Sequence, residues 1–158
     1  MKVKILIALA VVIVVFLYLF YSSANDPSEV KAVLTRVLDA GKGKDLDGVM
    51  DNFSLKYKDE YGLSYPLLKG MMKGEFDKYD LFEGEISNLR VVFHKNEQGE
   101  KTAIANFDVY VQGMKSGIPI ALIGTHDSPD KITVTLIKGV IGGWKIVSVS
   151  GVDERGMY

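Results

Sequence analysis

The densest cluster of polar and aromatic residues lies in one short segment, where Tyr57, Asp59 and Tyr61 alternate just before Gly62. A phenol beside a carboxylate can orient a ligand or move a proton, so one interpretation places this cluster at the mouth of a binding cavity. The structural alternative is that Tyr57 packs on a sheet while Asp59 accepts backbone N–H groups in the turn. We favour the structural interpretation.

A second carboxylate and phenol, Asp108 and Tyr110, lie two residues apart in the segment 102–112. This segment alternates between apolar and polar residues, which predicts a strand with an apolar row on one face and a mostly polar row on the other. If the polar row lined a cavity, Asp108 would be a base with a raised pKa and Tyr110 a proton donor. The apolar row is the more natural inner face, so we expect Asp108 to face solvent.

The remaining residues whose side chains could take part in catalysis or binding are expected to have structural roles. Trp144 begins a predicted strand, and we expect its ring to be packed and its N–H bonded rather than to form a ligand platform. The two histidines, His94 and His126, lie in different contexts, so the sequence predicts no metal site and no cofactor. The absence of cysteine excludes disulfides, thiol catalysis and cysteine metal sites.

An uninterrupted apolar run over residues 5–21 contains no charge, glycine or proline. Seventeen helical residues span about 26 Å, just enough for the hydrocarbon core of a bilayer. We predict an uncleaved anchor over residues 1–24 that contacts lipid through residues 5–21. The alternative is a signal peptide cleaved near Ala24, because small residues precede that position.

Lys2 and Lys4 precede the apolar run and predict a cytoplasmic N-terminus with an exported domain, as in a single-pass protein of a bacterial inner membrane. Cleavage would instead release a periplasmic or secreted domain. Beyond residue 24 there are 17 basic and 20 acidic residues, and this weakly acidic balance argues against nucleic acid as a partner. We assign residues 25–152 to one domain and residues 153–158 to a polar tail.

The first half of the domain has helical patterns. Asp26, Pro27 and Glu29 are typical of a helix start, and the apolar spacing from Val30 to Leu38 predicts one buried face. A short helix is expected over 45–50. Ser64 is expected to cap a third helix that buries Leu67, Leu68, Met71, Met72 and Phe76.

The second half has strand patterns over 85–94, 102–112, 118–125, 132–138 and 144–149. Three helices followed by an antiparallel meander predict an α+β fold, in which the helices pack on a curved sheet. A cavity between the helices and the sheet is the default place for a ligand.

Four segments in this order resemble the nuclear transport factor 2-like superfamily, whose members are also described as SnoaL-like or cystatin-like α+β cones. The segments are KDLDGVM at 44–50, FSLKYKD at 53–59, the strand core at 103–107, and the closing hairpin at 136–147 with its Gly-Trp-Lys-Ile-Val sequence. The resemblance covers residues 27–150. It implies a cone-shaped domain but no particular chemistry, because the superfamily includes isomerases, dehydratases, binding modules and scaffolds.

These observations favour a membrane-anchored domain that acts by binding or assembly rather than as an enzyme. The superfamily resemblance implies a homodimer through the outer face of the sheet, to which Thr133, Thr135 and Ile137 would contribute. A protein partner in a membrane complex is a second expectation. The alternative is a small-molecule enzyme with isomerase-like or dehydratase-like acid–base chemistry, or a carrier of hydrophobic ligands, using the cone cavity.

Overall fold

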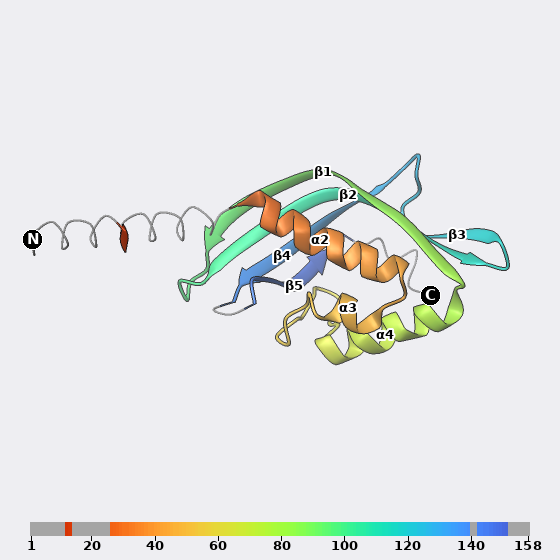
Figure 1. Cartoon of the computed structure of the whole chain (residues 1–158), viewed down its shortest axis with the longest axis horizontal. Coiled ribbons are helices and arrows are strands. Elements are labelled where there is room, and N and C mark those ends of the chain that lie inside the picture. The colour runs from red at the N-terminus through yellow and green to blue at the C-terminus, as the bar shows by residue number, and fades with distance from the viewer. Residues whose placement is uncertain (1–11, 14–25, 140–141, 152–158) are drawn as a thin grey trace, which may run out of the picture.

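The computed structural model describes residues 12–13, 26–139 and 142–151. Three helices precede five strands, as predicted. The elements are α2 (Pro27–Lys42), α3 (Leu46–Met50), α4 (Tyr65–Lys78), β1 (Leu81–Lys95), β2 (Lys101–Lys115), β3 (Ile118–Ile123), β4 (Asp130–Lys138) and β5 (Trp144–Ser150). The sheet arches over α2, and α3 and α4 lie on the same side (Figure 1).

Helix α2 begins where the sequence predicts. The Asp26 carboxylate accepts a 2.8 Å hydrogen bond from the Ser28 amide, and Pro27 occupies the first turn. Gly43 caps the C-terminus. Val30, Val33 and Leu34 are buried, which confirms the predicted inner face.

Helix α4 differs from its prediction in two respects. Ser64 occupies the N-cap position, but its side chain makes no capping hydrogen bond. Leu68 and Phe76 are buried as expected, whereas Leu67 is 59% exposed and Met71 is 39% exposed. The expectation that Leu67 and Met71 face inward is therefore wrong. Helix α4 lies at the periphery and packs through one narrow stripe, so its neighbouring apolar positions stay outside.

Strand β2 organises the sheet, whose strand order is β1-β2-β4-β5 with all pairs antiparallel. The residues of β2 up to Val109 pair with β4, and the residues from Val111 onward pair with β3 along the same edge. The β2–β3 turn uses Ser116 and Gly117, both with positive φ, as a two-residue hairpin of this kind requires. β3 is thus a short arm beside β4 rather than a full member of a meander.

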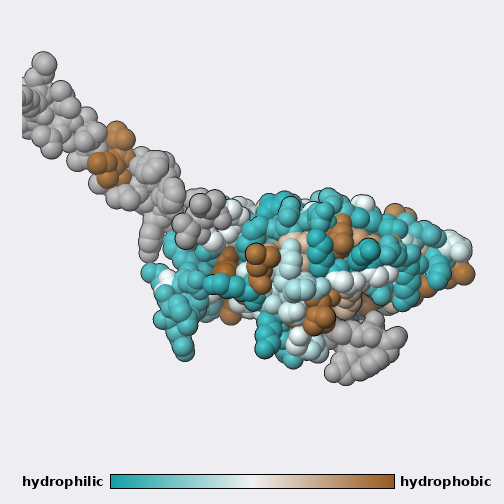
Figure 2. Space-filling model, turned by 90° about the horizontal axis from the view of Figure 1, so that it is seen from below, coloured by the Kyte–Doolittle hydropathy of each residue, from teal (hydrophilic) through white to brown (hydrophobic). Residues whose placement is uncertain are grey.

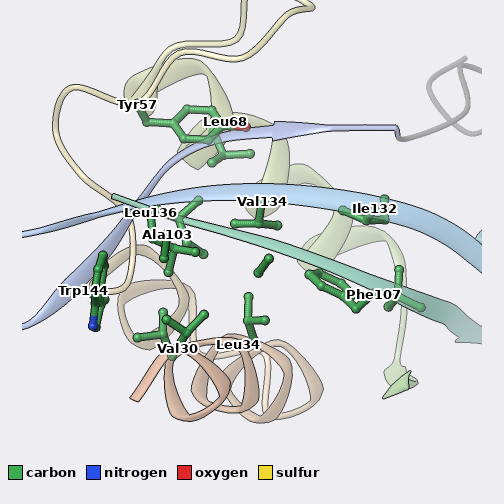
Figure 3. Packing of buried hydrophobic residues seen from close by; sticks show 14 of the residues in the cluster. Val30, Leu34, Tyr57, Leu68, Ala103, Phe107, Ile132, Val134, Leu136 and Trp144 are labelled. Atoms are coloured by element: carbon green, nitrogen blue, oxygen red, sulfur yellow. The ribbon is translucent and has the colours of Figure 1, made fainter. Parts of the chain in front are cut away.

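The core is continuous between the helices and the inner sheet face. Val30 and Leu34 of α2 point toward Ala103 and the strand residues around it (Figure 3). Ala103, Ala105, Phe107 and Val109 are all buried, which confirms that the apolar row of β2 faces the helices. A second cluster, formed by Val49, Phe76, Tyr79 and Phe82, packs α3 and α4 against the start of β1.

The predicted anchor over residues 5–21, the boundary at residue 24 and the tail at 153–158 lie outside the described residues, apart from Val12 and Ile13. Among the residues that the structure does describe, no helix has both the length and the apolar character needed to cross a membrane.

Candidate functional site

Tyr57 and Asp59 form a buried hydrogen-bonded pair in the loop between α3 and α4. The Tyr57 hydroxyl donates to Asp59 Oδ2 at 3.0 Å, and Asp59 Oδ1 accepts from the amides of Tyr61 at 3.0 Å and Leu63 at 2.9 Å. The Gly62 amide donates to the Asp59 carbonyl, which closes the turn. Both carboxylate oxygens are therefore bound within the loop. The backbone donors to Oδ1 agree with the structural interpretation, whereas the bond from the Tyr57 hydroxyl to Oδ2 was not part of it.

Burial and the neighbouring carboxylate change the acidity of Tyr57. The side chain is 3% exposed, and its ring meets Phe53 edge-on with ring centroids 5.3 Å apart. Desolvation, followed by the hydrogen bond to Asp59 and the negative charge of that group, raises the pKa of Tyr57 far above that of an exposed tyrosine. The phenol therefore keeps its proton and acts as a hydrogen-bond donor. Tyr61, the third member of the cluster, is 38% exposed at the turn.

Asp108 and Tyr110 lie on the outer face of the sheet, away from the helices. Asn88 donates a 2.7 Å hydrogen bond to Asp108 Oδ2 from the irregular part of β1, where Asn88 has a positive φ. The Tyr110 ring contacts the His126 ring at 5.5 Å. Asp108 therefore lies on the outer face, as expected, and the Asp108–Tyr110 pair is separated from the interior of the cone.

Trp144 connects the end of the sheet to the start of α2. Its ring is 3% exposed and lies 5.6 Å from the Phe93 ring, and its Nε1 donates to Glu29 Oε2 at 2.9 Å. Lys138 donates to the same Glu29 oxygen at 2.5 Å and lies over the indole ring. The ring is packed and its N–H is bonded, as predicted for a structural tryptophan.

The structure reveals polar contacts that sequence reasoning missed. Glu29 was expected only to support the helix start, but its carboxylate also binds Lys138 and Trp144, more than 100 positions away in the chain. Asn52 is 6% exposed and connects α2 to α3 through Arg36. The position of Glu29 in the first helical turn indicates a role for its carboxylate, whereas nothing in the local sequence indicates that Asn52 is buried.

The six predicted candidates do not converge on one site. Tyr57, Asp59 and Tyr61 share one loop, Asp108 and Tyr110 share the outer sheet face, and Trp144 lies at the end of the sheet near α2. The histidines are also dispersed: His126 lies beside Asp127 at 3.3 Å, while His94 is at the far end of β1. In the described part of the chain, no three His, Asp or Glu side chains gather as a metal-binding group.

Two clefts lie on the helix side of the described domain. One, of about 360 Å³, runs between α2 and β1 and has an apolar floor that includes Leu34, Leu38, Ile86 and Leu89. The other, of about 470 Å³, lies between α2, α3 and the start of β5. The surface seen from below Figure 1 is otherwise mostly hydrophilic, with separate hydrophobic residues (Figure 2).

The comparisons with known proteins find similarity in structure only. No protein-family model matches the chain. No curated protein sequence matches it either.

Several solved structures share the fold. An NTF2-like protein with a cystatin-like fold from Novosphingobium aromaticivorans aligns with a TM-score of 0.63 at 14% identity, covering 84% of each chain. An NTF2-like superfamily protein from Salmonella enterica aligns with a TM-score of 0.60 at 16% identity, covering 82% of this chain and 92% of that one.

The fold also occurs inside a longer protein. The helical cell shape determining protein Pgp2 from Campylobacter jejuni aligns with a TM-score of 0.62 at 12% identity over 75% of this chain. The chain spans only 38% of the length of that protein. At these identities the likeness concerns the fold alone, and the described domain has the α+β fold of nuclear transport factor 2-like proteins.

Proposed function

We propose that this chain is a membrane-anchored, exported domain that acts by binding or assembly through the outer face of its sheet. The observation that carries the proposal is a row of apolar and threonine side chains across three paired strands. Val92 of β1 pairs with Ile104 of β2, and Ile104 pairs with Thr135 of β4. Val92 is 50% exposed, and the other two are only partly buried.

The next row extends this patch. Thr102 of β2 pairs with Ile137 of β4, and both lie on the same face as Ile104 because strand residues alternate. Surface aliphatic and β-branched side chains that lie side by side on a sheet can pack against a second such sheet. A second copy of the chain is the partner that we propose, and a membrane-complex protein is the alternative occupant.

The side chains inside the cone offer little for catalysis, and this favours a function at the surface of the domain. The side chains that fill it are apolar, and Tyr57 and Trp144 contribute their rings while their polar atoms are bound to Asp59 and Glu29. A general base needs a carboxylate or imidazole within reach of a substrate proton. Asp108, the strand carboxylate, lies on the opposite face of the sheet.

Assembly is tested on the full chain purified in detergent, by analytical ultracentrifugation or native mass spectrometry. Ile104→Arg places a charge in the centre of the outer patch and should raise the dimer dissociation constant at least about tenfold. Leu67→Arg is the matched control, since Leu67 is exposed on α4 outside this face. A wild-type chain that stays monomeric at high micromolar concentration, or equal effects of the two variants, would refute assembly through this face.

Topology is tested separately by cysteine labelling, because the natural sequence contains no cysteine. Leu55→Cys introduces a thiol at a position that is 82% exposed. A membrane-impermeant maleimide applied to bacterial cells with a permeabilised outer membrane should label Leu55→Cys, but Lys2→Cys only after lysis. Labelling of both variants only after lysis would contradict export, and the mass of the native N-terminus distinguishes an anchor from cleavage near Ala24.

A second candidate function, carriage of a hydrophobic ligand, is favoured by the groove between α2 and β1. Its volume of about 360 Å³ is within the usual range for small-molecule sites. Lys31 and Lys42 lie at this groove and would favour an anionic head group on an apolar ligand. A mass increment that leaves on denaturation in native mass spectrometry would support carriage, and an empty protein extracted from its own membrane would count against it.

A further inference from the structure

The second cleft has a charge and a geometry that the proposed assembly does not use. It lies on the helix side of the domain, between α2, α3 and the start of β5, with a volume of about 470 Å³. Arg36, Asn52 and Lys145 are among the residues that line it. Ala40 and Gly48 also line it, and they bring α2 and α3 close together, since a Cβ added at Gly48 would lie 3.3 Å from the Ala40 Cβ.

Arg36 is held in place by a buried amide. Its Nε donates to Asn52 Oδ1 at 3.2 Å, and Asn52 Nδ2 donates to the Gly48 carbonyl at 2.8 Å. The Asn52 backbone carbonyl accepts from the Ile146 amide at 2.9 Å, which joins the same residue to β5. Because Asn52 is 6% exposed and bound on three sides, it is a rigid support for Arg36. A guanidinium fixed through Nε still has four other N–H donors available.

The charges around the cleft favour an anion. Lys145 Nζ donates to the backbone carbonyl of Asp51, so this ammonium group is also held at the cleft. Asp51 is the one acidic residue in the cleft lining. Within residues 26–139 and 142–151, neither Arg36 nor Lys145 forms an ion pair, in contrast to Lys138, whose ammonium binds the Glu29 carboxylate.

We propose that this cleft binds an oxyanion, a phosphate or carboxylate group carried by a small molecule. The guanidinium of Arg36 is the principal ligand, since its planar fork matches two oxygens of such a group, and Lys145 adds a second positive charge. Asn52 is a positioning residue that acts through Arg36. The size of the cleft leaves room for a ligand body beyond the oxyanion itself.

The test is a titration of the full chain in detergent at constant ionic strength, with inorganic phosphate in one arm and succinate in the other. Arg36 is one of three arginines in the sequence, with Arg90 and Arg155, so its Nε–H signal can be resolved by NMR. We expect a saturating shift of the Arg36 signal, with an apparent Kd of about 1–10 mM for a bare ion in an open cleft. The arm with the tighter Kd identifies the preferred oxyanion.

Three variants test whether the anion binds at this cleft. Arg36→Lys keeps the charge but loses the fork and should raise the Kd about tenfold, as measured by isothermal titration. Asp51→Asn removes the competing acid from an otherwise intact cleft and should lower the Kd. Lys115→Gln is the control: it removes one exposed positive charge at the end of β2, outside both clefts, and should leave the Kd within about twofold.

Three outcomes would overturn the proposal. The first is a shift that grows linearly without saturating in both arms. The second is an equal weakening by Lys115→Gln and Arg36→Lys, which would show that the overall positive charge of the protein, and not this cleft, attracts the anion. The third is weaker binding in Asp51→Asn, which would show that the Asp51 carboxylate supports binding and that the positive charges of the cleft do not drive it. None of these outcomes depends on whether the outer sheet face forms a dimer.

Discussion

Among the tyrosine and aspartate pairs that lie two residues apart in the chain, Tyr57–Asp59 and Asp108–Tyr110 occupy opposite environments in the fold. In the first pair, the hydroxyl donates directly to the carboxylate, and both groups are buried. In the second pair, Asp108 is bound by Asn88 and Tyr110 contacts His126, on the outer sheet face.

The difference shows that the local backbone conformation decides whether the two side chains of such a pair bind each other or residues of other segments. A turn between Asp59 and Leu63 brings the side chains and amides around one carboxylate. In a strand, residues two apart point in the same direction but are held about 7 Å apart by the extended backbone, so each finds its partner on a neighbouring segment.

Asp59→Ala should destabilise the domain most among these changes, by about 2–4 kcal/mol. It removes the acceptor of the Tyr57 hydroxyl and of two amides, so buried donors lose their partners. Denaturant unfolding followed by the fluorescence of Trp144, the single tryptophan, measures the loss. Asp108→Ala is the matched comparison, and similar losses in the two variants would contradict the assignment of Asp59 to the turn.

Tyr57→Phe should cost about 1–2 kcal/mol, because Asp59 Oδ2 loses its hydroxyl donor while the ring packing is kept. The same unfolding experiment measures the change. In the Asp59→Ala background the Tyr57→Phe effect should nearly vanish, since the hydroxyl then has no carboxylate to bind. Additive losses in the double variant would show that the two groups act independently.

Alkaline pH should destabilise the wild-type chain more than Tyr57→Phe. The raised pKa of Tyr57 means that the folded state keeps a proton that the unfolded state releases near pH 10. This contribution to stability is complete below pH 10 and is lost as the pH rises above it, by about 1.4 kcal/mol per pH unit. Unfolding curves between pH 9 and pH 11 measure the difference, and parallel pH dependence in the two proteins would contradict it.

Tyr110→Phe should change the free energy of unfolding by less than about 0.5 kcal/mol, because the hydroxyl is on the outer face and the ring contact with His126 is retained. The measurement is the same unfolding experiment. If Tyr110→Phe instead destabilised the chain as much as Tyr57→Phe, the outer face would have to be covered in the folded protein, for example by a second copy.

Much of the fold is predictable from local patterns. The spacing of Val30, Val33 and Leu34 identifies the inner face of α2, and the alternation along β2 identifies which row meets the helices. The prediction for α4 is wrong at Leu67 and Met71, because a helix with apolar residues around much of its circumference does not indicate which stripe its neighbours cover. The start of β1 at Leu81 rather than Glu85 likewise depends on its pairing with the end of β2.

Local sequence is sufficient to predict the succession of helices and strands, the start of α2 and the turn around Asp59, because each depends on residues within a few positions of one another. Three other features become visible only in the folded chain. Glu29 binds Lys138 and Trp144, β3 pairs with the same edge of β2 as β4, and Asn52 holds Arg36 at a cleft. These contacts join segments that are distant along the chain. Their partners are selected by sheet register and by how α2 and α3 pack, and neither is encoded in a local pattern.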